Sequence, residues 1–124
     1  MRVFKNKWFN RWARNEKISD ATLRKTSEAI ISGHVEADLG GSLFKKRIAK
    51  AGTGKSGGYR TIVGYKRPNT ERIIFLYAFG KNERANISHK EEAALSITAE
   101  AFISATDKQV SELLEKGSVW EVKS

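Results

Sequence analysis

Four basic residues fall on or beside three short segments whose pattern predicts β-strands, and their spacing brings them together. Lys45 and Arg47 alternate along the first segment, Arg60 begins the second, and Lys81 follows the end of the third. Because neighbouring antiparallel strands run in opposite directions, Lys81 is expected beside Arg60, and both beside the strand of Arg47. Several cations on one sheet face suit a phosphodiester, since guanidinium groups grip its oxygens and stabilise the charge that grows during transfer.

Cleavage of RNA would also need a group to deprotonate the ribose 2′-hydroxyl and a group to protonate the leaving oxygen. The two histidines, His34 and His89, fall in a loop and in the first turn of an expected helix, and both are expected at the surface. A lysine whose pKa is lowered by neighbouring positive charges can serve instead, as can the carboxylate of Glu83. No metal ion and no cofactor are expected, because the basic segment has no carboxylate cluster.

Three strands must position these cations, because the apolar pattern changes after residue 41 from a helical period to a period of two. The expected strands span residues 43–50, 59–66 and 72–79, and the turn sequence at 67–70 joins the last two in an antiparallel hairpin. The third strand is apolar on both faces. It is therefore expected at the centre of the sheet, with a helix covering one side.

Helices are expected before and after these strands. Phe4, Trp8 and Trp12 recur every four residues and predict a helix over 4–15. A second helix is expected over 19–32, with a cap at its start and a glycine at its end, and it forms a hairpin with the first. The remaining expected elements are a helix that begins at Ser88, a helix over 107–116 and an edge strand over 119–122.

This order of helices, strands and helices predicts an α+β fold in one domain over residues 1–124. Its parts are an N-terminal helical hairpin, a twisted antiparallel sheet and a C-terminal helix. Residues 104–124 form an acidic extension that is expected to pack on this domain and complete the core through Trp120.

The positive charge is concentrated in the middle of the chain. The net charge is +9 overall, +10 over residues 41–90 and −4 over residues 91–124. A basic folded segment of this kind indicates a polyanionic partner, of which nucleic acid is the commonest. The chain has no cysteine, which excludes disulfides and a thiol nucleophile, and no apolar run that could serve as a signal peptide or membrane span. The expected location is the cytoplasm.

The glycine-rich segment 52–58 looks like a phosphate-binding loop, but it lacks the first glycine of that motif. A strand follows it where the motif requires a helix, so no helix N-terminus would meet the phosphates. Nucleotide hydrolysis is therefore not expected. The preferred interpretation is a basic loop whose amides and Lys55 approach a backbone phosphate.

Three segments together resemble one toxin family: LFKKRIA at 43–49, GKSGGYR at 54–60 and FGKNE at 79–83. With the NIS sequence at 86–88 before an amphipathic helix, they are similar to the HigB-type branch of the RelE/ParE toxin superfamily. The similarity covers roughly residues 1–103 in order and spacing. It implies the α+β fold described above, with a helical hairpin, a twisted antiparallel sheet and a C-terminal helix.

The resemblance also implies a function, namely a messenger RNA endonuclease that depends on the ribosome and is the toxin of a type II toxin–antitoxin pair. Such toxins enter the ribosomal A site and cut the codon there without a metal ion, by attack of the 2′-hydroxyl on the adjacent phosphate. By motif, Arg47 and Arg60 would hold the phosphate, and Lys81 and Lys45 would act in acid–base or charge roles. The partner that restrains the toxin would be a cognate antitoxin, commonly a helix-turn-helix protein.

Further side chains are expected to contact RNA or the ribosome: Lys46, Lys50, Lys55, Tyr59, Lys66, Arg67 and Arg84. Tyr59 and Tyr77 are the candidates for stacking on a base, and core packing is the expected role of Tyr77. Two alternatives share the fold: a ParE-like inhibitor of DNA gyrase, and a nucleic-acid-binding module without catalysis.

Overall fold

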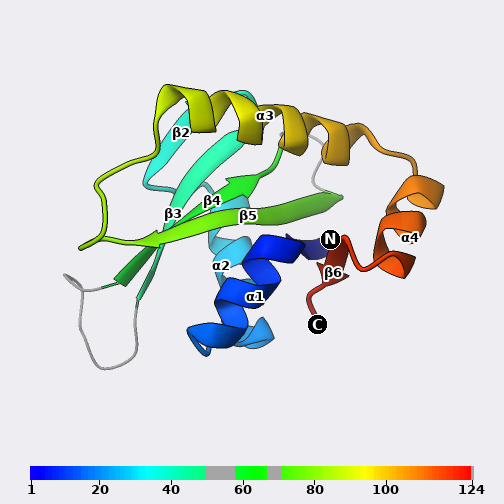
Figure 1. Cartoon of the computed structure of the whole chain (residues 1–124), viewed down its shortest axis with the longest axis horizontal. Coiled ribbons are helices and arrows are strands. Elements are labelled where there is room, and N and C mark those ends of the chain that lie inside the picture. The colour runs from blue at the N-terminus through cyan, green and yellow to red at the C-terminus, as the bar shows by residue number, and fades with distance from the viewer. Residues whose placement is uncertain (50–57, 67–70, 124) are drawn as a thin grey trace.

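The computed structural model describes residues 1–49, 58–66 and 71–123, in which six strands form one sheet with helices on both faces (Figure 1). The strands are β1 (Arg2–Asn6), β2 (Ala37–Gly40), β3 (Leu43–Ala49), β4 (Gly58–Gly64), β5 (Arg72–Gly80) and β6 (Val119–Glu121). The helices are α1 (Lys7–Asn15), α2 (Asp20–Ile31), α3 (His89–Ser104) and α4 (Asp107–Glu115). The sheet order is β2-β3-β4-β5-β1-β6, with α3 across one face and α1 and α2 on the other.

The three predicted strands form an antiparallel meander, β3-β4-β5, as expected. β5 is central and buried on both faces. Ile73 and Phe75 belong to the core under α1 and α2, while Ile74 and Leu76 belong to the core under α3. In β3, Phe44 and Ile48 pack toward α1 and α2. Because side chains alternate along a strand, Lys45 and Arg47 lie on the other face.

The helix predicted over 4–15 is wrong at its start, because residues 2–6 form β1 and the helix begins at Lys7. β1 runs parallel to β5 and places Val3 in one core and Phe4 in the other, both fully buried. Asn6 makes the joint between strand and helix. Its side chain accepts a hydrogen bond from the Phe9 N–H (2.8 Å) and donates one to the Leu76 carbonyl oxygen (3.0 Å).

The other helices begin and end as their caps predict. The Ser19 side chain caps α2, and Gly33, just after its end, has the positive φ of 89° that glycine adopts readily. The expected Ser88–Glu91 capping box opens α3. α4 follows directly after α3. Within the described residues, no helix is both long enough and apolar enough to cross a bilayer.

The C-terminal segment packs on the sheet through its valines. Val110, Val119 and Val122 are buried, whereas Trp120, which was expected to complete the core, is only half-buried. β6 pairs antiparallel with β1, and the Val122 N–H donates to the Val3 carbonyl oxygen (2.8 Å).

Candidate functional site

Two of the predicted catalytic arginines meet in the middle of the meander. Arg47 of β3 and Arg60 of β4 are directly opposite each other, so their side chains start from the same face of the sheet. Lys45 lies two residues before Arg47 and shares that face. Lys45 and Arg47 are half-buried, and in the described part of the chain no ion pair involves either of them. The face therefore presents positive charge that is not neutralised there.

Arg60 has one counter-charge, the carboxylate of Glu36. The Arg60 Nε lies 2.7 Å from Oε2 and 2.9 Å from Oε1 of Glu36, and the arginine side chain is 12% exposed. Its Nη1 is buried and has no hydrogen-bond partner among the described residues. A buried donor without a partner destabilises a protein by roughly 1–3 kcal/mol. The guanidinium is thus held on one edge by Glu36, while its Nη1 is a buried donor without a partner in the described structure.

Lys81 lies next to this pair at the end of β5. Its N–H donates to the Gly58 carbonyl oxygen (3.2 Å), at the start of β4 and two residues before Arg60. The lysine is exposed. The meander therefore brings Lys45, Arg47, Arg60 and Lys81 to one region of the sheet, as their spacing predicted. Their catalytic roles remain predictions.

The family assignment follows from the whole chain. The family model described as the RelE toxin of the RelE / RelB toxin–antitoxin system matches residues 1–122. The chain belongs to the RelE toxin family. It is thus a toxin of a toxin–antitoxin system, and an antitoxin is its partner. A comparison with curated proteins found no match. The HigB-type branch within the superfamily remains a prediction.

In this RelE-family toxin, Tyr59, a candidate for stacking on a base, is buried against α1. The side chain is 6% exposed, lies edge-on to Trp12 with ring centroids 4.9 Å apart, and donates its hydroxyl to Glu16 Oε1. This hydrogen bond, together with burial, raises the pKa of Tyr59 to about 12. Tyr59 belongs to the α1 side of the sheet and packs against α1, and its contact with RNA remains a prediction.

The other predicted contacts are dispersed over this toxin. Side chains alternate along β3, so Lys46 lies on the face covered by α1 and α2, whereas Arg47 lies on the other face of the sheet. Lys66 follows the far end of β4, 3.8 Å from Glu100. Arg84 forms a two-pronged ion pair with Glu91 (2.6 and 2.9 Å). Three of the predicted residues lie outside the described residues: Lys50, Lys55 and Arg67.

Among the candidate bases, Glu83 is exposed, and its side chain accepts the Gly80 N–H (3.3 Å). The histidines His34 and His89 are exposed, as expected. Sequence reasoning missed Glu36, the carboxylate that lies within the cationic region. Glu36 stands immediately before β2, a strand of four residues that the pattern of apolar residues did not predict.

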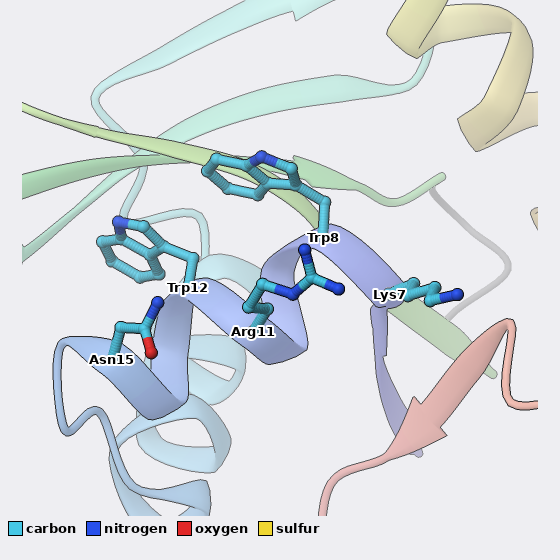
Figure 2. Close-up of a pocket in the computed structure, with 5 residues that line it drawn as sticks. All are labelled: Lys7, Trp8, Arg11, Trp12 and Asn15. Atoms are coloured by element: carbon cyan, nitrogen blue, oxygen red, sulfur yellow. The ribbon is translucent and has the colours of Figure 1, made fainter.

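A groove on α1 of the toxin was also missed. Lys7, Trp8, Arg11, Trp12 and Asn15 line an open volume of about 510 Å³ (Figure 2). The recurrence of Phe4, Trp8 and Trp12 predicts a helix over 4–15 but no binding surface. The signal that could have revealed the groove is the alternation of the two tryptophans with Lys7 and Arg11.

Proposed function

We propose that this toxin is an endoribonuclease that cleaves messenger RNA on the ribosome without a metal ion. The observation that carries the proposal is the Arg47–Arg60 pair, two guanidinium groups on one sheet face with a buried, unpartnered Nη1 in the described structure. Family membership supports it, because the proposed activity is one that the resemblance to RelE-like toxins implies.

In the proposed reaction, the ribose 2′-oxygen attacks the adjacent phosphorus, and the bond from phosphorus to the 5′-oxygen breaks. Arg47 and Arg60 bind the non-bridging oxygens and stabilise the charge that develops on them. Lys81 and Lys45 supply the acid–base or charge roles, so that a proton leaves the 2′-hydroxyl and another reaches the departing 5′-oxygen. The products are a 2′,3′-cyclic phosphate and a 5′-hydroxyl end.

The proposal places the toxin in the cytoplasm, where the messenger is read in the ribosomal A site. The cognate antitoxin, proposed to be a helix-turn-helix protein, restrains it there. The basic character of residues 41–90 matches a nucleic-acid target.

The test is to add the purified protein to a translating extract and to map messenger ends. Arg60→Ala and Lys81→Ala should each reduce cleavage by about 10²–10³-fold, the usual effect of removing a transition-state donor. Lys25→Ala, an exposed lysine on α2, is the control and should cleave like the wild type. Intact messages during a stall in translation would contradict the proposal. Loss of supercoiling by DNA gyrase would instead favour the ParE-like alternative, and salt-sensitive binding without cleavage would favour a binding module.

A further inference from the structure

The α1 groove holds the most exposed aromatic ring system in the described part of the chain. Trp8 is 44% exposed, and Trp12 beside it is half-buried. Figure 2 shows the two indole rings on one side of α1, with the Arg11 side chain next to them. An exposed tryptophan that completes no core indicates a surface for binding.

The two rings form a shelf with a fixed orientation. Their planes differ by only 9°, with centroids 6.4 Å apart. Trp8 packs against Tyr77 of β5 at 4.6 Å, and Trp12 packs against Phe9 at 5.2 Å and against Tyr59. Because each indole rests on a ring of the core, little side-chain freedom remains to be lost when a flat ligand stacks on it.

The charge of α1 selects an anionic ligand. The helix carries Lys7, Arg11 and Arg14 and no carboxylate, and the first two of these cations line the groove. Glu16, the first carboxylate after the helix, accepts the hydroxyl of Tyr59. A cationic groove with aromatic faces is the usual site for single-stranded nucleic acid, in which phosphates meet the cations and bases stack on the rings.

Asn15, at the end of the groove, adds an amide that can both donate to and accept from the edge of a base. An acidic peptide would satisfy the cations, but it would leave the parallel indole faces without a planar partner. These observations favour RNA over a protein segment as the occupant.

Tyr77 of β5 connects the groove to the strand that pairs with β4. Tyr77, which supports Trp8, is 6.2 Å from Phe79 by ring centroids, and Phe79 lies opposite Arg60. The pairing of β1 with β5 ends at Phe75, so no described strand covers this side of β5 from Tyr77 onward. The groove therefore lies beside a part of β5 with which no described strand pairs.

We propose that the Trp8–Trp12 groove binds single-stranded RNA by stacking one of its bases, at a distance from the phosphate that is cut. The proposal rests on the proposed function, since it assigns the groove to the same messenger. It adds an RNA-binding site on α1 and two residues, Trp8 and Arg11, that would hold the substrate without taking part in the reaction.

The test uses a short oligouridylate and the quenching of tryptophan fluorescence, in a Trp120→Phe background so that only the α1 tryptophans report. Trp8→Ala should weaken binding roughly 5- to 150-fold, the range for loss of one stacked base, and Trp8→Phe should restore most of it. An oligomer with abasic positions should bind equally to Trp8→Ala and to its parent. Arg11→Gln should lower the slope of log affinity against log salt by about 0.7, whereas Lys25→Gln should leave it unchanged.

Equal affinity of Trp8→Ala and its parent for oligouridylate would overturn the proposal, provided that circular dichroism shows both to be folded. Quenching by the cognate antitoxin but not by RNA would overturn it as well and would make the groove a protein-docking site. The nuclease proposal fails separately. If oligouridylate quenches the tryptophan fluorescence but messages stay intact in the translating extract, only the proposal of cleavage is contradicted. Conversely, if Trp8→Ala cleaves messages and binds RNA as well as the wild type does, only the proposal that the groove binds RNA is contradicted.

Discussion

Arg47 and Arg60 lie directly across from each other on β3 and β4, and only Arg60 has a carboxylate partner in the described residues. Like charges at opposite positions of an antiparallel pair repel and destabilise the sheet. Arg60 pairs with Glu36, whereas Arg47 has no such partner, so an uncharged residue at position 47 would remove the repulsion without breaking an ion pair of the described residues. We infer that the arrangement is kept for an anion that binds between the two guanidinium groups.

Replacing Arg47 by glutamine should therefore stabilise the protein and inactivate it. The expected gain is roughly 0.2–1 kcal/mol in the free energy of unfolding, the size of one cross-strand interaction. Urea titration measures the gain, and messenger mapping measures the loss of cleavage. Lys46→Gln, on the opposite face of the same strand, is the control and should give no such gain. A fall in stability for Arg47→Gln would show that repulsion between Arg47 and Arg60 does not destabilise the wild-type protein.

Glu36→Gln should have the opposite effect, because it leaves the arginine pair without a counter-charge. Arg60 is 12% exposed and already has one unpartnered nitrogen, so the free energy of unfolding should fall by roughly 1–3 kcal/mol. Sulfate should restore part of this loss, because an anion can take the place of the carboxylate. Thermal unfolding in sulfate and in chloride of equal ionic strength measures the effect. If sulfate stabilises the variant no more than the wild type, no anion site has been opened.

The Arg84–Glu91 ion pair at the start of α3 should make the free energy of unfolding depend on pH in the acidic range. The hydrogen bonds from Arg84, together with that from the Ser88 N–H, lower the pKa of Glu91 from 4.5 to about 2. A carboxyl with a lowered pKa stabilises the fold above its ordinary pKa, and this contribution is lost as the pH falls from about 4.5 toward 2. Thermal unfolding over this range should show a steeper fall for the wild type than for Glu91→Gln. Glu112→Gln, on the exposed side of α4, should follow the wild type.

Arg72 should contribute far more stability than the superficially similar Arg2. The buried Arg72 donates to the carbonyl oxygens of Phe102 (3.0 Å) and Ala105 at the end of α3, and to Asp107 (2.8 Å). Arg72→Met leaves these acceptors unpaired and should lower the free energy of unfolding by roughly 2–4 kcal/mol.

Arg2 makes two hydrogen bonds to the Glu121 carboxylate, but both side chains are about 40% exposed. Arg2→Met should therefore change stability by at most about 1 kcal/mol. Urea titration of both variants checks the comparison. Similar losses for the two would mean that burial does not decide the strength of these contacts.

What sequence could predict depended on how near the determining contacts lie along the chain. The position of Arg47 opposite Arg60 follows from strand alternation and one short connection, so it was accessible. The caps at Ser19 and Ser88 act within one helical turn, and both helices begin where predicted. The four cations were found together for the same reason, since the meander is built from consecutive strands.

Phe4 shows where this reasoning fails. Its four-residue spacing from Trp8 fits a helix, but the residue is drawn into a strand by a partner some 70 positions away in β5. No local pattern contains that information. The spacing of Phe4, Trp8 and Trp12 therefore predicts the helix but not the groove that the two tryptophans line. Glu36 was missed because β2 has only four residues and ends in glycine.

The parallel pairing of β1 with β5 also affects how the protein folds. The β3-β4-β5 meander joins neighbouring segments and can form early, whereas β1 can dock only after a loop of about 70 residues has closed. Among the described strands, β6 pairs with β1 alone, so its pairing must follow that of β1. We therefore expect a folding intermediate in which the arginine-bearing strands are already paired. In this intermediate, the edge of β5 that pairs with β1 is still unpaired and its apolar side chains are exposed to solvent. During this delay, a toxin molecule is most exposed to proteases and to aggregation.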